Sequence, residues 1–200
     1  MPFLVPEKLP QHKPTIIAIR SIAPKSGATS VVWKLASEYK QNNKKILIFD
    51  EFLGLPNTPY KNRNEQLIPS VLNGQNSLNQ LIDTAQGIDF IAGQSTTNIH
   101  TLSEQEQNHI RTQLLFLIQS YDYVLLDVPS QCTETILSPD ETFWVCLPAK
   151  KHIFNAIQRS NLPAKIILNK VQSDTNVADL NLYLKQLSDK AQLYRQFSVS

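Results

Sequence analysis

The stretch TIIAIRSIAPKSGATSVVWKLASEYKQNNKKILIFD, residues 15–50, decides the fold. It holds two apolar runs, at 16–19 and 46–49, which are separated by a loop at 21–30 and by apolar residues at helical spacing. Strand, loop, helix and strand form one βαβ unit, and open α/β sheets bind phosphate groups at the loop of such a unit. The loop has the length and position of a phosphate-binding loop but lacks most of its working residues.

The rest of the chain alternates between apolar runs and amphipathic segments. The pattern predicts strands at 15–20, 45–50, 88–92, 121–127, 143–147 and 164–169. It predicts helices at 29–42, 66–73, 77–84, 103–120, 150–160 and 175–192. Because six strands alternate with helices, we expect an α/β fold with a doubly wound, mainly parallel sheet and helices on both faces.

Composition favours one globular domain. Residues 1–14 hold four prolines and predict an extended lead-in, and residues 15–200 predict a single domain. A net charge of +2 is too small to favour nucleic acid or an anionic membrane as a partner. Cys132 and Cys146 lack metal-ligand spacing, so we expect thiols in a reducing cytoplasm. The apolar runs are too short to span a membrane, and the last helix has too narrow an apolar stripe for membrane targeting.

Polar residues follow four of the predicted strands, at the strand ends where this architecture binds ligands. They are the loop at 21–30, Asp50, Asp127 and Asn169. Together, in this order, they match the layout of a P-loop ATPase. The candidate nucleotide-binding residues are Lys25, Ser26, Gly27, Ala28, Thr29, Ser30 and Asn169, and the candidate Mg²⁺ ligands beside a bound nucleotide are Thr29, Asp50 and Asp127.

Over residues 15–172 the motifs resemble those of the MinD/ParA family of P-loop ATPases, whose loop reads KGGxGK[ST][ST]. Residues 27–30 (GATS) keep the glycine and both hydroxyl residues of that loop. Residues 53–57 (LGLPN) resemble the LGLxN segment of the family, and residues 121–127 (YDYVLLD) resemble its Walker B strand. Residues 168–170 (LNK) resemble the turn that contacts the base. The order of the motifs is most similar to that in the flagellar-number regulators (FlhG/FleN type). The loop sequence is more similar to that of the TadZ/CpaE pilus-assembly proteins and the BcsQ cellulose-synthesis proteins.

Several residues depart from the family pattern. Ala28 stands at the position of the P-loop lysine, Ala23 at that of the signature lysine and Phe52 at that of the switch aspartate. Pro24 and Lys25 replace loop glycines, and Gln131 replaces the switch glycine. Phosphoryl transfer relies on positioning and charge neutralisation, and loss of one such group commonly costs ~100-fold or more in rate. We therefore expect a pseudo-ATPase that binds ATP or ADP with Mg²⁺ weakly or not at all.

Some residues have two interpretations that the sequence leaves open. Lys25 either replaces the missing cation or extends into solvent. Thr29 and Ser30 suit helix caps as well as phosphate ligands. Asp127 either orients a metal ion or only pairs with Thr29, and Asn169 either caps a turn or contacts a base. The histidines at positions 12, 100, 109 and 152 show no triad or metal pattern, so we assign them no role.

The resemblance implies a catalytically degenerate regulatory or scaffold protein that works through protein partners at a polar surface machine, a flagellum or a pilus. The implied partners are an assembly GTPase, a transcriptional regulator or a pole-organising protein, with recruitment to the cell pole and a homodimer as further implications. One alternative is an active or weakly active, ATP-dependent dimerising ATPase that uses Lys25. A second alternative is a scaffold without a nucleotide site that dimerises through the faces around Trp33 and Phe52. A third is a cellulose-synthesis or DNA-partition protein, and the sequence shows no basic stripe that would favour DNA binding.

Overall fold

The computed structural model describes residues 13–51, 67–91, 99–132, 134–160, 164–187 and 191–198. The strands are β1 (Thr15–Ser21), β2 (Ile46–Asp50), β3 (Asp83–Ala85), β4 (Ile88–Ile91), β5 (Tyr123–Val128), β6 (Glu141–Cys146), β7 (Ala164–Val171) and β8 (Ala191–Ser198). The α-helices are α1 (Ala28–Gln41), α2 (Leu67–Leu72), α3 (Glu104–Leu117), α4 (Lys150–Arg159) and α5 (Val177–Leu187). Short 3₁₀ helices are η1 (Leu78–Leu81), η2 (Ile99–Thr101) and η3 (Ile118–Ser120).

The described strands form one sheet in the order β3-β4-β2-β5-β1-β6-β7-β8. Only the β3–β4 pair is antiparallel among the pairs in this sheet. Strand β1 lies between β5 and β6, so the loop that follows β1 leaves the sheet near its middle. This arrangement confirms the predicted mainly parallel, doubly wound α/β fold.

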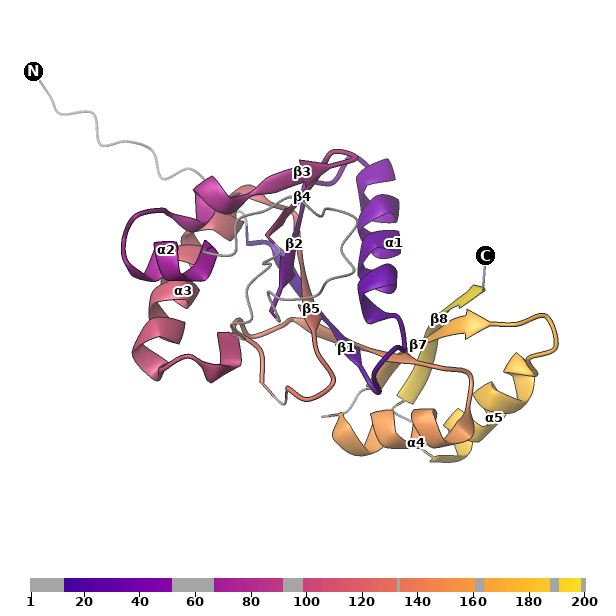
Figure 1. Cartoon of the computed structure of the whole chain (residues 1–200). Coiled ribbons are helices and arrows are strands. Elements are labelled where there is room, and N and C mark those ends of the chain that lie inside the picture. Colours follow the sequence, from indigo (N-terminus) through magenta and orange to yellow (C-terminus); the bar gives the residue numbers. More distant parts are fainter. Residues whose placement is uncertain are drawn as a thin grey trace, which may run out of the picture.

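Helices cover both faces of the sheet (Figure 1). Helix α1 packs on one face, where its Val32 and Leu35 join a core that includes Ile17 of β1. On the opposite face, α3 covers one half of the sheet through Ile110 and Leu114. Helices α4 and α5 cover the other half of that face, over β6 and β7. The chain between β5 and β6 lies between these two groups of helices (Figure 1).

The structure contradicts two of the predicted elements. The predicted helix at 77–84 is η1 followed by strand β3, which turns into β4 through Gln86 and Gly87, both at positive φ. Such a two-residue turn is typical of a tight hairpin. The predicted helix at 175–192 ends at Leu187, and residues 191–198 form β8 beside β7. The sheet therefore has two strands more than predicted.

Parts of the predicted layout lie outside the described residues. These are most of the proline-rich lead-in, Phe52 and the LGLPN segment at 53–57. Within the described part of the chain, no helix is both long enough and apolar enough to cross a membrane.

Candidate phosphate-binding site

The loop after β1 is folded tightly on itself. The Ser21 hydroxyl donates to the carbonyl of Ala23 at 2.6 Å, and the Ser21 and Ser26 hydroxyl oxygens lie 2.6 Å apart. The main-chain N–H of Ser26 donates to the same Ala23 carbonyl. Lys25 and Gly27 have left-handed backbones, with φ of 63° and 83°. Alternating conformations of this kind are typical of loops whose main-chain N–H groups bind anions.

Strand β7 holds this loop in place through two consecutive side chains. The buried amide of Asn169 donates to the carbonyl of Ser26 at 2.8 Å and to that of Gly27 at 3.4 Å. The Lys170 ammonium donates to the carbonyl of Lys25 at 2.9 Å. A Cβ atom on Gly27 would lie only 2.3 Å from Nδ2 of Asn169, so this position requires glycine. The structure thus brings together Asn169 and the predicted loop residues 25–27.

The first turn of α1 carries the remaining predicted loop residues. Gly27 is the N-cap and Ala28 is the first helical residue, so neither Thr29 nor Ser30 caps the helix. That possible role for the two hydroxyl residues is wrong, because the helix begins before them. The Thr29 hydroxyl instead bonds to the carboxylate of Asp127, and Ser30 is exposed. Ala28 is buried, and it offers only a methyl group at the position where the family pattern has a lysine side chain.

Two aspartates stand side by side at the carboxyl ends of neighbouring strands. Asp50 of β2 and Asp127 of β5 are partners in the parallel register, and both are buried. Burial raises the pKa of Asp127 to about 6, the Thr29 hydroxyl lowers it, and the Glu51 carboxylate raises it. Mg²⁺ is commonly held by one or two carboxylates together with substrate phosphates. Thr29, Asp50 and Asp127 fit that pattern, although within the described ranges no group of three His, Cys, Asp or Glu side chains could by itself hold a metal ion.

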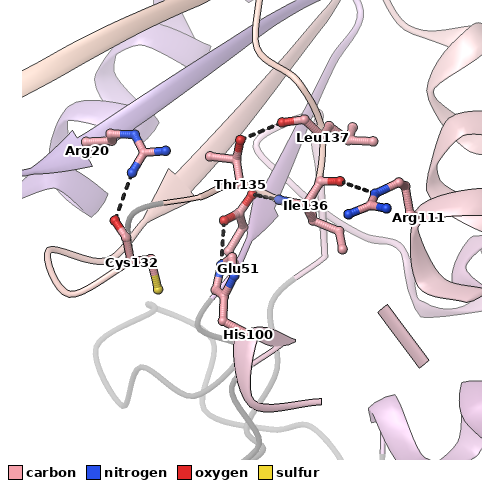
Figure 2. Close-up of polar contacts among 8 residues, drawn as sticks. All are labelled: Arg20, Glu51, His100, Arg111, Cys132, Thr135, Ile136 and Leu137. Carbon is pink, nitrogen blue, oxygen red and sulfur yellow. Dashed lines mark hydrogen bonds and ion pairs between the residues drawn. The ribbon is translucent and has the colours of Figure 1, made fainter. Parts of the chain in front are cut away.

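The sequence did not reveal the buried charges beside this site. Glu51 is fully buried, and its Oε1 accepts the main-chain N–H of Ile136 at 2.9 Å. Its Oε2 lies 2.9 Å from Nε2 of His100, a histidine for which the sequence pattern predicts no role. Figure 2 shows Glu51 between His100 and the chain that follows β5. Because each carboxylate oxygen has a partner, Glu51 connects the end of β2 both to His100 and to the segment between β5 and β6.

Two arginines contact the segment between β5 and β6 from other directions (Figure 2). Nη1 of Arg20 donates to the carbonyl of Cys132 at 2.8 Å, and Nε of Arg111 donates to the carbonyl of Ile136 at 2.9 Å. Burial lowers the pKa of Arg20, and the Glu51 carboxylate raises it. Here three charged side chains hold residues 132 and 136 in place.

These residues carried weak sequence signals. Arg20 is a charged residue that ends the apolar run 16–19, and Glu51 directly follows Asp50. Either could have been identified as a buried charge at a strand end. His100 could not, because its partner is 49 residues away in the sequence.

No family model matches the sequence, and no curated protein matches it. Solved structures do resemble the fold. A protein assigned to plasmid partition in Borrelia burgdorferi B31, bound to AMPPNP, has a TM-score of 0.70 and 20% identity, over 94% of this chain and 88% of the other. MinD from Pyrococcus horikoshii OT3, complexed with Mg-ADP, has a TM-score of 0.68 and 19% identity, over 93% and 82%. The Aquifex aeolicus MinC:MinD complex has a TM-score of 0.65 and 18% identity, over 93% and 82%. The chain has the P-loop NTPase-like fold of the ParA and MinD ATPases.

Proposed function

We propose that this chain is a catalytically degenerate, MinD/ParA-like regulatory or scaffold protein that acts by binding protein partners. The observation that carries the proposal is the start of α1. Ala28, at the position of the phosphate-binding lysine, offers only a buried methyl group. A P-loop lysine contacts the β- and γ-phosphates, and its loss removes the main cation that neutralises the transferred group.

The remaining features favour weak binding of phosphate over turnover. The N-terminus of α1, a helix of 14 residues, presents main-chain N–H groups and the positive end of its dipole. Thr29, Asp50 and Asp127 would hold Mg²⁺ beside a bound phosphate, and this ion would supply charge neutralisation. Ser26, Gly27 and Ala28 would contribute main-chain N–H groups. The same loop is bonded to Asn169, which limits the movement with which a flexible loop closes around phosphates.

A second candidate function is a weakly active, ATP-dependent dimerising protein. The observation that favours it is the position of two lysines at the loop. The Lys170 ammonium lies 2.9 Å from the carbonyl of Lys25, and the Lys25 side chain is exposed. Either ammonium could approach a bound phosphate by a rotamer change. In this candidate, Lys25 replaces the cation that Ala28 lacks.

The cellular role in the proposal rests on the order of the sequence motifs. That order favours placement or regulation of a polar surface machine, a flagellum or a pilus, with an assembly GTPase, a transcriptional regulator or a pole-organising protein as partner. It also favours a homodimer and recruitment from the cytoplasm to the cell pole. A cellulose-synthesis or DNA-partition role is the alternative, and the net charge of +2 does not favour DNA binding.

Calorimetric titration with Mg-ATP and Mg-ADP tests the proposal, with light scattering on the same samples. We expect a dissociation constant weaker than about 100 μM or no heat at all, and the same mass with and without nucleotide. Binding in the micromolar range and ATP-dependent dimerisation, both lost in Lys25→Ala, would contradict the proposal and support the second candidate. The matched control is Lys185→Ala, which removes an exposed lysine from α5.

A further inference from the structure

A cleft of about 790 Å³ opens on the sheet face opposite α1. None of the loop residues 21–30 lines it, so it is separate from the candidate phosphate-binding site. Its walls are residues of the chain between β5 and β6 and the end of α4, at Arg159 and Ser160. Its volume is in the range of small-molecule sites.

The floor of the cleft comes from two neighbouring strands. Arg20 of β1 and Trp144 of β6 are partners in the parallel register, and Thr142 lies two residues before Trp144 on the same face. The guanidinium carbon of Arg20 lies 5.8 Å from the centre of the Trp144 ring. This contact and the bond to the Cys132 carbonyl fix the orientation of the guanidinium group.

Arg20 has more hydrogen-bonding capacity than its surroundings use. A guanidinium group has five N–H donors, and within the described part of the chain only Nη1 of Arg20 donates, to Cys132. The side chain is buried, and a buried charge is costly unless it is paired. The Glu51 carboxylate interacts with Arg20 only through longer-range electrostatics, because its two oxygens are paired with the Ile136 N–H and with His100. The remaining donors of Arg20 are available to a group in the cleft.

A second arginine enters the cleft from α4. Nη1 of Arg159 donates to the carbonyl of Ser130 at 3.4 Å, and the rest of this exposed side chain lines the cleft. Carbonyls of Ser130 and Cys132 are within about 7 Å of each other by chain geometry, so the two guanidinium groups are anchored to the same short segment. Glu134 is the only acidic residue among the described lining residues.

Hydroxyl groups supply further donors. Ser130, Ser138 and Thr142 line the cleft, and within the described ranges their hydroxyls make no hydrogen bond to another residue. A guanidinium group can donate two parallel N–H bonds to two oxygens of one phosphate or carboxylate group, and hydroxyls can donate to its other oxygens. We propose that this cleft binds a small molecule that carries phosphate or carboxylate groups, with Arg20 and Arg159 as the charged contacts.

The test uses inorganic pyrophosphate and citrate as probes for the two chemistries. Trp144 emission reports binding because its ring contacts Arg20, and Trp33→Phe, on the opposite face, removes the other tryptophan signal. We expect saturable binding of at least one probe. Tighter binding of pyrophosphate would identify a phosphate ligand, and tighter binding of citrate a carboxylate ligand.

Charge variants decide where the probe binds. We expect Arg159→Gln to weaken binding by about tenfold, and Glu134→Gln to strengthen it by about two- to fivefold. Lys151→Gln removes an equal charge from the exposed side of the same helix and should leave affinity unchanged. Equal weakening by Arg159→Gln and Lys151→Gln would overturn the proposal. So would the absence of saturation at about 10 mM, or binding that Thr29→Ala abolishes, which would place the anion at the loop after β1.

Discussion

The side-chain amide of Asn169 donates to the main-chain carbonyl of Ser26 at 2.8 Å, although the two residues are 143 positions apart in the sequence. Both residues are buried. The bond connects strand β7 to the loop after β1, and a second bond from the same amide reaches Gly27. In this conformation the amide supports the loop rather than facing open solvent.

Asn169→Ala should therefore destabilise the fold. The substitution leaves two loop carbonyls without this donor, and a buried acceptor that loses its partner costs about 1–3 kcal/mol. Urea denaturation measures the loss in the free energy of unfolding. Asn155→Ala, at an exposed position of α4, is the control and should change that free energy by less than about 0.5 kcal/mol. An equal effect of the two substitutions would show that the Asn169 bonds do not stabilise the loop.

Gly27→Ala should destabilise the protein more than Gly74→Ala. Both glycines have positive φ, 83° and 71°, so both substitutions cost backbone strain of about 1 kcal/mol. Only at Gly27 would the new Cβ collide with another group, Nδ2 of Asn169, whereas Gly74 has open space around it. We expect an additional loss of at least about 1 kcal/mol at Gly27, measured by denaturant unfolding. Equal losses would mean that Asn169 moves away without cost.

Most of the fold could be predicted because buried parallel strands are continuous apolar runs. The run 124–126 and the run 143–147 stand out for this reason. Strand β3 has only three residues, too few for a period to appear. Strand β8 was hidden because Ala191 continues the helical spacing of Leu184 and Leu187 in α5. Its identity depends on pairing with β7, which is a tertiary contact.

The candidate site was predictable only in part. The adjacency of Asp50 and Asp127 follows once β2 and β5 are neighbours, and the order of the motifs favours that arrangement. The contacts of Glu51 with His100 and Ile136 join segments without any shared local pattern. Those contacts depend on how the connections cross the sheet, and no periodicity in the sequence encodes that path.

The contribution of Asp140 to stability should depend on pH. The main-chain N–H of Ile16 and, secondarily, the Lys13 ammonium hold the pKa of Asp140 below its usual value. A carboxylate with a lowered pKa in the folded state stabilises the protein above its unfolded pKa, and this contribution is lost as the pH falls through the folded value. Asp140→Ala should cost about 1 kcal/mol near pH 7 and progressively less below about pH 4. Urea denaturation at several pH values measures the difference.

The control for this pH series is Asp174→Ala, at an exposed position after β7. At this exposed surface position it should change the free energy of unfolding by less than about 0.5 kcal/mol near pH 7. If the cost of Asp140→Ala were constant between neutral and acidic pH, the ionised carboxylate would not be the stabilising form.

Ala28→Lys should strengthen ATP binding. It restores an ammonium group at the first residue of α1, where a charge-assisted contact with phosphate is worth about 1.5–3 kcal/mol, or roughly tenfold or more in affinity. Calorimetry with Mg-ATP measures the gain. Ala178→Lys adds the same charge at an exposed position of α5 and should have no effect. Unchanged affinity in Ala28→Lys would show that the loop no longer has room for phosphates.

The rate of phosphate release from Mg-ATP tests the central claim most directly. Wild-type protein is compared with Thr29→Ala, which lacks the hydroxyl that bonds to Asp127. A contaminating ATPase would give the same signal in both preparations, so the difference between them is decisive. We expect no difference, because the wild-type loop already lacks the lysine needed for turnover. Mg²⁺-dependent phosphate release in the wild type that Thr29→Ala abolishes would show that the chain is an active ATPase.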